Sequence, residues 1–131
     1  MSSQEPLVSV RNTTRGTLPR VPFEAIARKV LGDTYSLSLV ICGDTLSRRI
    51  NLEYRKKDYS PNVLSFPLTP NEGEIFIDVR KAERESKGLG TTPTKRIAHL
   101  FTHGCFHLKG LDHSDEMDAA ENKVLRDFKL D

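Results

Sequence analysis

Apolar residues recur along the chain with two different periods, and this separates the segments expected to be strands from those expected to be helices. Residues 7–12, LVSVRN, alternate apolar and polar side chains, as a half-buried strand does. Residues 36–43, SLSLVICG, are typical of a central strand, and residues 74–79, EIFIDV, alternate again. Residues 62–67, NVLSFP, predict a short strand that we expect Pro67 to end, because proline has no N–H for a strand ladder.

Helical periodicity occupies the first two segments between these strands. In residues 21–32, VPFEAIARKVLG, apolar side chains spaced three and four apart share one face, and Gly32 lies just past the expected end. A second helix is expected from residue 44 or 45, either of which can cap it, to about residue 54. Its expected buried stripe is Leu46, Ile50 and Tyr54.

Three further helices are expected in the second half of the chain. The segment RKAERESKG predicts a polar helix that ends at Gly88, and the loop LTPNEG separates the two strands before it. Thr92 and Pro93 form a good helix start for a segment that runs to a stop at Gly110. Ser114 caps the last helix. The expected buried stripe of that helix is Met117, Ala120, Val124 and Phe128.

The order of these elements favours an α+β fold in which a small, mixed, four-stranded sheet packs against helices. A chain of 131 residues has room for one domain with a real core, and we expect residues 1–131 to form it. No apolar run is long enough to cross a bilayer, and no signal-peptide pattern opens the sequence. Two cysteines cannot form a disulfide framework, so we expect Cys42 and Cys105 to be buried thiols in a cytoplasmic protein.

The net charge of +2 is unevenly distributed along the chain. Residues 1–102 carry 16 lysines and arginines against 11 acidic residues, whereas residues 103–131 carry 4 against 7. A solvated surface is the simpler explanation of this charge by itself. A basic body would nevertheless suit a polyanionic substrate such as RNA.

Three of the four histidines lie within eleven residues, in the segment HGCFHLKGLDH. His103 and His107 are four positions apart on the expected helix, so their imidazoles project from the same face. Gly110 allows the chain to turn sharply and to bring His113 back toward this pair. Three imidazoles that leave a fourth position open are typical of a catalytic zinc site, and we expect one Zn²⁺ per chain.

The neighbours of these histidines suggest supporting roles and argue against one class of enzyme. His99, one helical turn before His103, is expected to support a ligand rather than to be a fourth ligand. Asp112 either accepts a hydrogen bond from a ligand imidazole or caps the turn. The histidine spacing matches the metzincin proteases, but those enzymes have a glutamate as general base where this sequence has Gly104. Peptidase chemistry is therefore disfavoured.

These residues resemble the YbeY family of endoribonucleases, whose signature is similar to H-G-x-x-H-L-x-G-x-D-H. The matching positions here are His103, Gly104, His107, Leu108, Gly110, Asp112 and His113. Upstream, the family's helix end is matched by Asn51, Tyr54 and Arg55, and its next strand by NVLSFP. The resemblance covers roughly residues 36–125, with Pro61 where the family usually has threonine and Glu74 where it usually has aspartate.

The resemblance implies a zincin-like metal-binding helix, with zinc held by His103, His107 and His113. It implies cleavage of single-stranded RNA in rRNA maturation, including 3′-end processing of the small-subunit rRNA, and in ribosome quality control, with ribosomes or ribosome-associated proteins as partners. Arg55, otherwise a solvated residue in the run RKK, becomes the candidate catalytic residue that stabilises charge developing on the phosphoryl group. Ser65 is expected at the edge of the substrate cleft.

Two other functions stay open on the sequence alone. One is a different metallohydrolase, such as a peptidase or a small-molecule hydrolase. The other is a ribosome-assembly factor without catalytic activity, in which the metal only holds the fold.

Overall fold

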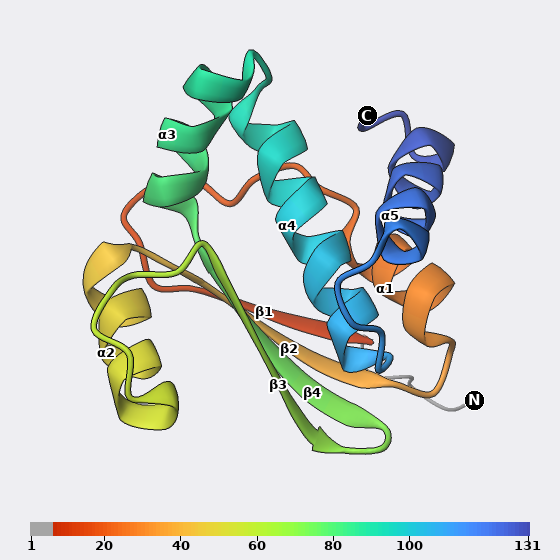
Figure 1. Ribbon diagram of the computed structural model, residues 1–131, viewed down its shortest axis with the longest axis horizontal. Coiled ribbons are helices and arrows are strands. Elements are labelled where there is room, and N and C mark those ends of the chain that lie inside the picture. Colours follow the sequence, from red (N-terminus) through yellow and green to blue (C-terminus); the bar gives the residue numbers. More distant parts are fainter. Residues whose placement is uncertain (1–6) are drawn as a thin grey trace.

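The computed structural model describes residues 7–131 as an α+β fold (Figure 1). The elements in chain order are β1 (Val8–Asn12), α1 (Phe23–Leu31), β2 (Ser36–Cys42), α2 (Asp44–Arg55), β3 (Val63–Thr69), β4 (Glu72–Asp78), α3 (Val79–Leu89), α4 (Pro93–Leu108) and α5 (Asp115–Asp127). The strands form one sheet in the order β1-β2-β4-β3, in which β3 alone among these strands runs antiparallel to its neighbour. The predicted mixed four-stranded sheet is confirmed.

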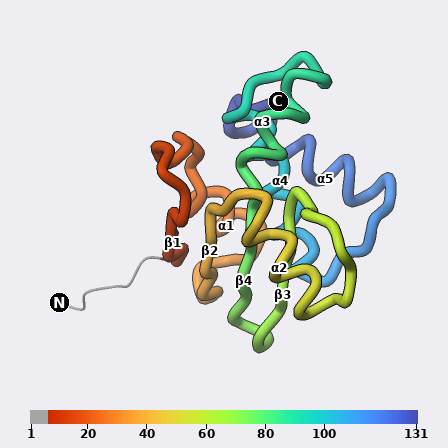
Figure 2. Tube along the Cα trace, turned by 90° about the vertical axis from the view of Figure 1, so that its left-hand side faces the viewer, coloured from red at the N-terminus to blue at the C-terminus, as the bar shows by residue number. Residues whose placement is uncertain are grey.

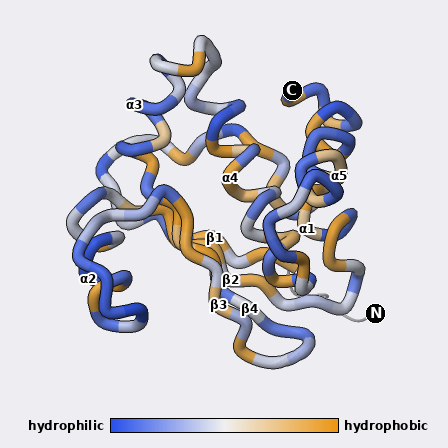
Figure 3. Tube along the Cα trace, in the orientation of Figure 1, coloured by the Kyte–Doolittle hydropathy of each residue, from blue (hydrophilic) through white to orange (hydrophobic). Residues whose placement is uncertain are grey.

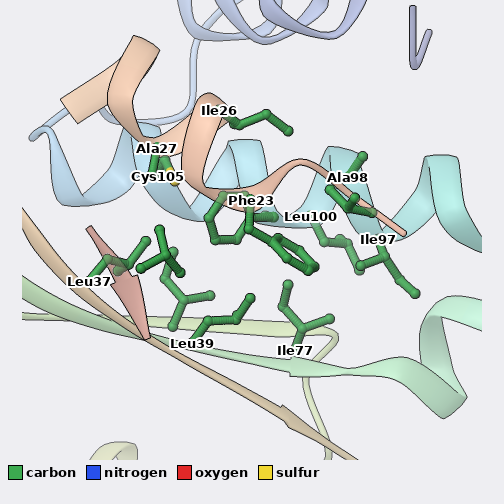
Figure 4. Close-up of a cluster of buried hydrophobic side chains, with 14 of the residues drawn as sticks. Phe23, Ile26, Ala27, Leu37, Leu39, Ile77, Ile97, Ala98, Leu100 and Cys105 are labelled. Carbon is green, nitrogen blue, oxygen red and sulfur yellow. The ribbon is translucent and has the colours of Figure 1, made fainter. Parts of the chain in front are cut away.

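The sheet separates two apolar clusters because alternate residues of a strand point to opposite faces. On one face, Leu39 and Ile77 pack with α1 and α4, where Phe23 and Phe101 meet edge to face with ring centroids 4.9 Å apart. Figure 4 shows these apolar side chains gathered between the strands and the two helices. On the other face, Val40 belongs to a smaller apolar cluster that α2 covers. The colouring of Figure 3 follows this division, with hydrophobic central strands and largely hydrophilic outer turns.

Helix α4 carries the histidine segment and has the boundaries that the sequence predicts. The side chain of Thr92 accepts a hydrogen bond from the N–H of Lys95, and Pro93 occupies the first helical position. Past the helix end, Gly110 has φ +103°, a conformation that favours glycine. The turn after α4 therefore depends on this glycine.

The prediction that Pro67 ends its strand is wrong, since β3 continues to Thr69. The N–H of Asp78 donates to the carbonyl of Asn62, so hydrogen-bonded pairs recur at every second residue from Asn62. Pro67 lies between two of these pairs, so its backbone nitrogen faces the free edge of the sheet. Its missing N–H therefore removes no hydrogen bond between strands. The predicted loop LTPNEG is also wrong, because only Pro70 and Asn71 connect β3 to β4.

Two further details of the predicted helices are wrong. Helix α3 does not stop at Gly88 but continues to Leu89, because Gly90 adopts the left-handed conformation that ends the helix. Tyr54 is not in the buried stripe of α2, since it is 64% exposed. The buried positions of α2 are instead Ser47 and Asn51, whose side chains hold the loop that follows the helix. None of the described helices combines the length and the apolar character of a bilayer-spanning segment.

Candidate active site

The three clustered histidines converge in space. Helix α4 carries His103 and His107 with their Nε2 atoms 2.9 Å apart, and the turn at Gly110 returns His113 to the pair. One ring nitrogen of each histidine lies within 4.8 Å of the corresponding nitrogens of the other two. Together they form a group that could hold a metal ion.

Hydrogen bonds on the outer side of two rings determine which nitrogens face the centre. Nδ1 of His103 lies 2.8 Å from a carboxylate oxygen of Glu121, and Nδ1 of His107 lies 3.1 Å from the carbonyl oxygen of Leu111. Both oxygens can only accept, so both Nδ1 atoms carry the proton and both Nε2 lone pairs point inward. Burial, assisted by the His103 ring, lowers the pKa of His107 and favours its neutral form. Neutral imidazoles of this kind fit the donor set that Zn²⁺ binds.

Glu121 of α5 is a site residue that the sequence reasoning missed. Its side chain bridges the two rings, with Oε2 on His103 and Oε1 3.0 Å from Nε2 of His99. Burial by itself raises the pKa of the Glu121 carboxyl, but the hydrogen bonds from His103 and His99 outweigh it and hold the pKa at about 2. A signal was present in the sequence: Glu121 lies on the apolar stripe between Met117 and Val124, and a buried carboxylate needs partners.

His99 lies behind the cluster rather than in it. Its Nδ1 is 3.3 Å from a guanidinium nitrogen of Arg96, and its Nε2 is engaged with Glu121. Arg96 in turn pairs with Glu85 at 3.0 Å, and Glu85 accepts hydrogen bonds at 3.3 Å from the amide of Asn62. A continuous chain of polar contacts therefore links the histidines to the residues before β3.

Asp112 is exposed, and its carboxylate makes no hydrogen bond with an imidazole within residues 7–131. The ring partners are Glu121 and the backbone of Leu111 instead. The turn beside Asp112 is held by backbone bonds, from the N–H of Gly110 to the carbonyl of His107 and from the N–H of Leu111 to the carbonyl of Phe106.

The histidines open onto a cleft of about 630 Å³ whose lining also includes residues of the segment between α2 and β3 and of α3. Arg55 and Ser65, both expected from the sequence, line this cleft. So do several residues that the sequence reasoning did not single out as cleft residues, namely Tyr59, Pro61, Asn62, Lys81 and Glu85. Tyr59, Lys81 and Glu85 belong to no motif, so only the fold places them near the histidines, whereas Pro61 and Asn62 adjoin or begin the NVLSFP segment.

Gly104 has a packing role that explains why no glutamate occupies this position. A Cβ atom on Gly104 would lie 2.9 Å from Oγ of Ser65 and 3.0 Å from a methyl carbon of Ile75. The hydroxyl of Ser65 also donates to the carbonyl of Gly104 at 3.3 Å. Helix α4 therefore packs directly on β3 and β4 here, and the space that the general base of a metzincin would need is closed.

Comparisons with known proteins show which family this chain resembles. A family model described as "Endoribonuclease YbeY" matches residues 8–129. Curated relatives that carry the same name are 40% identical over 108 residues in Allorhizobium ampelinum and 36% identical over 117 residues in Solibacter usitatus. These matches cover 72% and 86% of this chain, and 65% and 80% of the relatives' own lengths. A third, in Stutzerimonas stutzeri, is 37% identical and covers 78% of this chain and 68% of the relative.

A solution structure of a protein from Thermotoga maritima has a similar fold. The TM-score is 0.67 with 22% sequence identity, and the match covers 93% of this chain and 91% of that one. At this identity the likeness supports the fold alone.

Proposed function

Because the chain belongs to the YbeY family, we propose that it is a zinc-dependent endoribonuclease that cleaves single-stranded RNA. The observation that carries the proposal is the convergence of His103, His107 and His113 in a cleft that Arg55 also lines. A metal group and a cation in one cleft suit the hydrolysis of a phosphodiester.

The three histidines would hold the metal, and Zn²⁺ suits them because their donors are imidazole nitrogens with hydrogen-bonded outer sides. Zinc in such a site supplies Lewis acidity toward a phosphoryl oxygen and toward water. Glu121 holds the His103 ring in the tautomer that binds a metal, and the carbonyl of Leu111 does the same for His107.

Arg55 would act on the phosphate. Its planar guanidinium presents paired N–H donors that fit two oxygens of one phosphate. Negative charge grows on these oxygens during cleavage, so a fixed cation on the cleft wall stabilises the transition state more than the ground state. Lys81 adds a second cation to the same wall.

The biological setting is proposed from the family, whose role is rRNA maturation. We expect this chain to act in the cytoplasm on rRNA, including 3′-end processing of the small-subunit rRNA, and to take part in ribosome quality control. Its partners would be the ribosome or ribosome-associated proteins. The excess of basic residues in the first 102 positions supports a polyanionic substrate.

The test combines metal analysis of the purified protein with cleavage of a labelled single-stranded RNA. We expect one zinc per chain, loss of both zinc and cleavage in His107→Ala, and about 100-fold slower cleavage with zinc retained in Arg55→Ala. Arg49→Ala is the matched control, because Arg49 lies on the same helix but lines a different surface hollow. Its activity should be unchanged.

Three results would contradict the proposal. The first is a zinc-loaded wild type that cleaves peptides but not RNA, which would favour another metallohydrolase. The second is normal rRNA maturation in cells that carry only a metal-free ligand variant, which would favour a non-catalytic assembly factor. The third is equal RNA cleavage by wild type and His107→Ala, which would indicate a contaminating nuclease.

A further inference from the structure

Tyr59 presents an exposed aromatic ring to the histidine cleft. The loop between α2 and β3, whose backbone Figure 2 shows, contains this residue. Tyr59 lines the same cleft as the histidines and Arg55 and is 47% exposed. Tyr54, the tyrosine at the end of α2, is also exposed but lines none of the hollows described here. Its ring packs against Phe66 instead, with centroids 5.7 Å apart. The two tyrosines therefore share exposure but not position.

The backbone that carries Tyr59 is held unusually firmly for an exposed loop. Three successive carbonyl groups, at positions 59–61, each accept a hydrogen bond from a side chain. The donors are Asn51 to the first at 3.0 Å, Lys81 to the second at 2.7 Å and Ser47 to the third at 2.7 Å. Asn51 and Ser47 are buried on the inner side of α2. An aromatic ring on such a loop loses little conformational freedom when a ligand binds to it.

Positive charge flanks this ring. Nζ of Lys81 lies 6.0 Å from the centroid of the Tyr59 ring, and Arg55 lines the same cleft. A flat apolar face beside two cations matches a nucleotide, whose base stacks on an aromatic ring while its phosphates pair with cations. The amide of Asn62 and the carboxylate of Glu85, which also line the cleft, add polar groups within the same space.

Resting on the function proposed above, we propose that Tyr59 is a base-stacking platform that holds one unpaired nucleobase beside the histidine cluster. Arg55 and Lys81 then face the adjoining phosphates. A base inside a duplex has both faces covered by its neighbours, so this subsite accepts a base only from single-stranded or locally opened RNA. Stacking tolerates every base, and the subsite therefore selects for strand state rather than for sequence.

The chain contains no tryptophan, which makes a direct test possible. Tyr59→Trp and Tyr54→Trp each introduce a single, selectively excitable tryptophan, at the proposed platform and at the matched control position. Both proteins, as purified, are titrated with a single-stranded oligoribonucleotide, the same sequence as a duplex, and the single strand with abasic sites. We expect strong quenching only for Tyr59→Trp with the intact single strand, because only there does a base stack on the indole.

A second measurement uses wild type and substitutions without a fluorophore. Tyr59→Ala should weaken single-strand binding about tenfold, whereas Tyr59→Phe keeps the ring and should bind like wild type. Tyr54→Ala should change affinity less than twofold. Circular dichroism confirms the fold of each variant, and Tyr59→Phe separates loss of the ring from loss of the hydroxyl.

Equal quenching at both positions, or equal RNA affinity of Tyr59→Ala and Tyr59→Phe, would contradict the proposed base-stacking role of Tyr59. If wild type shows histidine-dependent RNA cleavage while Tyr59 behaves like Tyr54, the platform fails and the proposed nuclease stands. If the intact single strand alone quenches Tyr59→Trp but no RNA is cleaved, the stacking site stands and the nuclease fails.

Discussion

Two carboxyl groups, one on α5 and one at the start of α3, are equally buried and yet have pKa values shifted in opposite directions. Glu121 and Asp78 are each 1% exposed. Two imidazoles hydrogen-bond to Glu121, one at each oxygen, and the pKa of this carboxyl is held at about 2. Asp78 caps α3 with one oxygen, while the other has no hydrogen-bond partner within residues 7–131. Burial, together with the neighbouring carboxyl of Asp44, raises the pKa of Asp78 to about 7.

Burial by itself raises the pKa of both groups, so the partners decide which carboxyl is charged. Glu121 retains its charge because two ring N–H groups require an acceptor, and this charge orients a residue of the candidate metal site. Asp78 instead serves the backbone by accepting from the N–H groups of Arg80 and Lys81, both at 3.1 Å. A buried carboxylate is therefore informative about function only when its partners are known.

The largest expected effect comes from removing the charge of Glu121. In Glu121→Gln one end of the side chain becomes an NH₂ group, which cannot accept from an imidazole N–H, so one of the two histidines loses its partner. We expect zinc affinity to fall about 10- to 100-fold, measured by competition with a chromophoric chelator. Asp112→Asn is the control, since Asp112 is exposed, and it should leave the affinity unchanged. If Glu121→Gln and wild type bind zinc equally tightly, Glu121 does not support the metal site.

The next effect tests how closely the histidine helix is packed. Gly104→Ala places a methyl group against Ser65 and Ile75, and we expect the free energy of unfolding to fall by about 1 to 3 kcal/mol. Gly88→Ala, within helix α3, is the matched helical control. A Cβ there meets no other atom within 4 Å, so alanine should leave stability unchanged or raise it by up to about 1 kcal/mol. Urea unfolding measures both, and equal effects would contradict the close approach of α4 to the sheet.

The smallest expected effect comes from the same carboxyl-to-amide change at Asp78. Because the folded protein keeps a proton on Asp78 up to about pH 7 and the unfolded chain releases it near its ordinary pKa of 3.8, wild-type stability falls as pH rises through this window. Asp78→Asn keeps the capping oxygen and cannot ionise. It should therefore gain about 1 kcal/mol over wild type between pH 6 and pH 7, by urea unfolding at each pH. A difference between the two proteins that does not change with pH would contradict the raised pKa of Asp78.

The fold and half of the site could be predicted from the sequence because they depend on local periodicity. Alternation along β2 and β4 gave the sheet, and the caps at Thr92 and Gly110 gave α4 its ends. The spacing of His103 and His107 then placed two imidazoles on one helical face, and the comparisons confirmed the family resemblance that begins with these residues.

Contacts between distant segments were decided only by the tertiary structure. Pro67 stays within β3 because β3 is an edge strand, and edge position depends on the order of the strands. Glu121 meets His103 across the packing of α5 on α4, so the residue that orients the ring is 18 positions away rather than in the histidine segment. Tyr59 lines the histidine cleft, and side chains of α2 and α3 hold the carbonyls of its loop there. Periodicity describes one element at a time, whereas these contacts depend on which elements pack across the sheet.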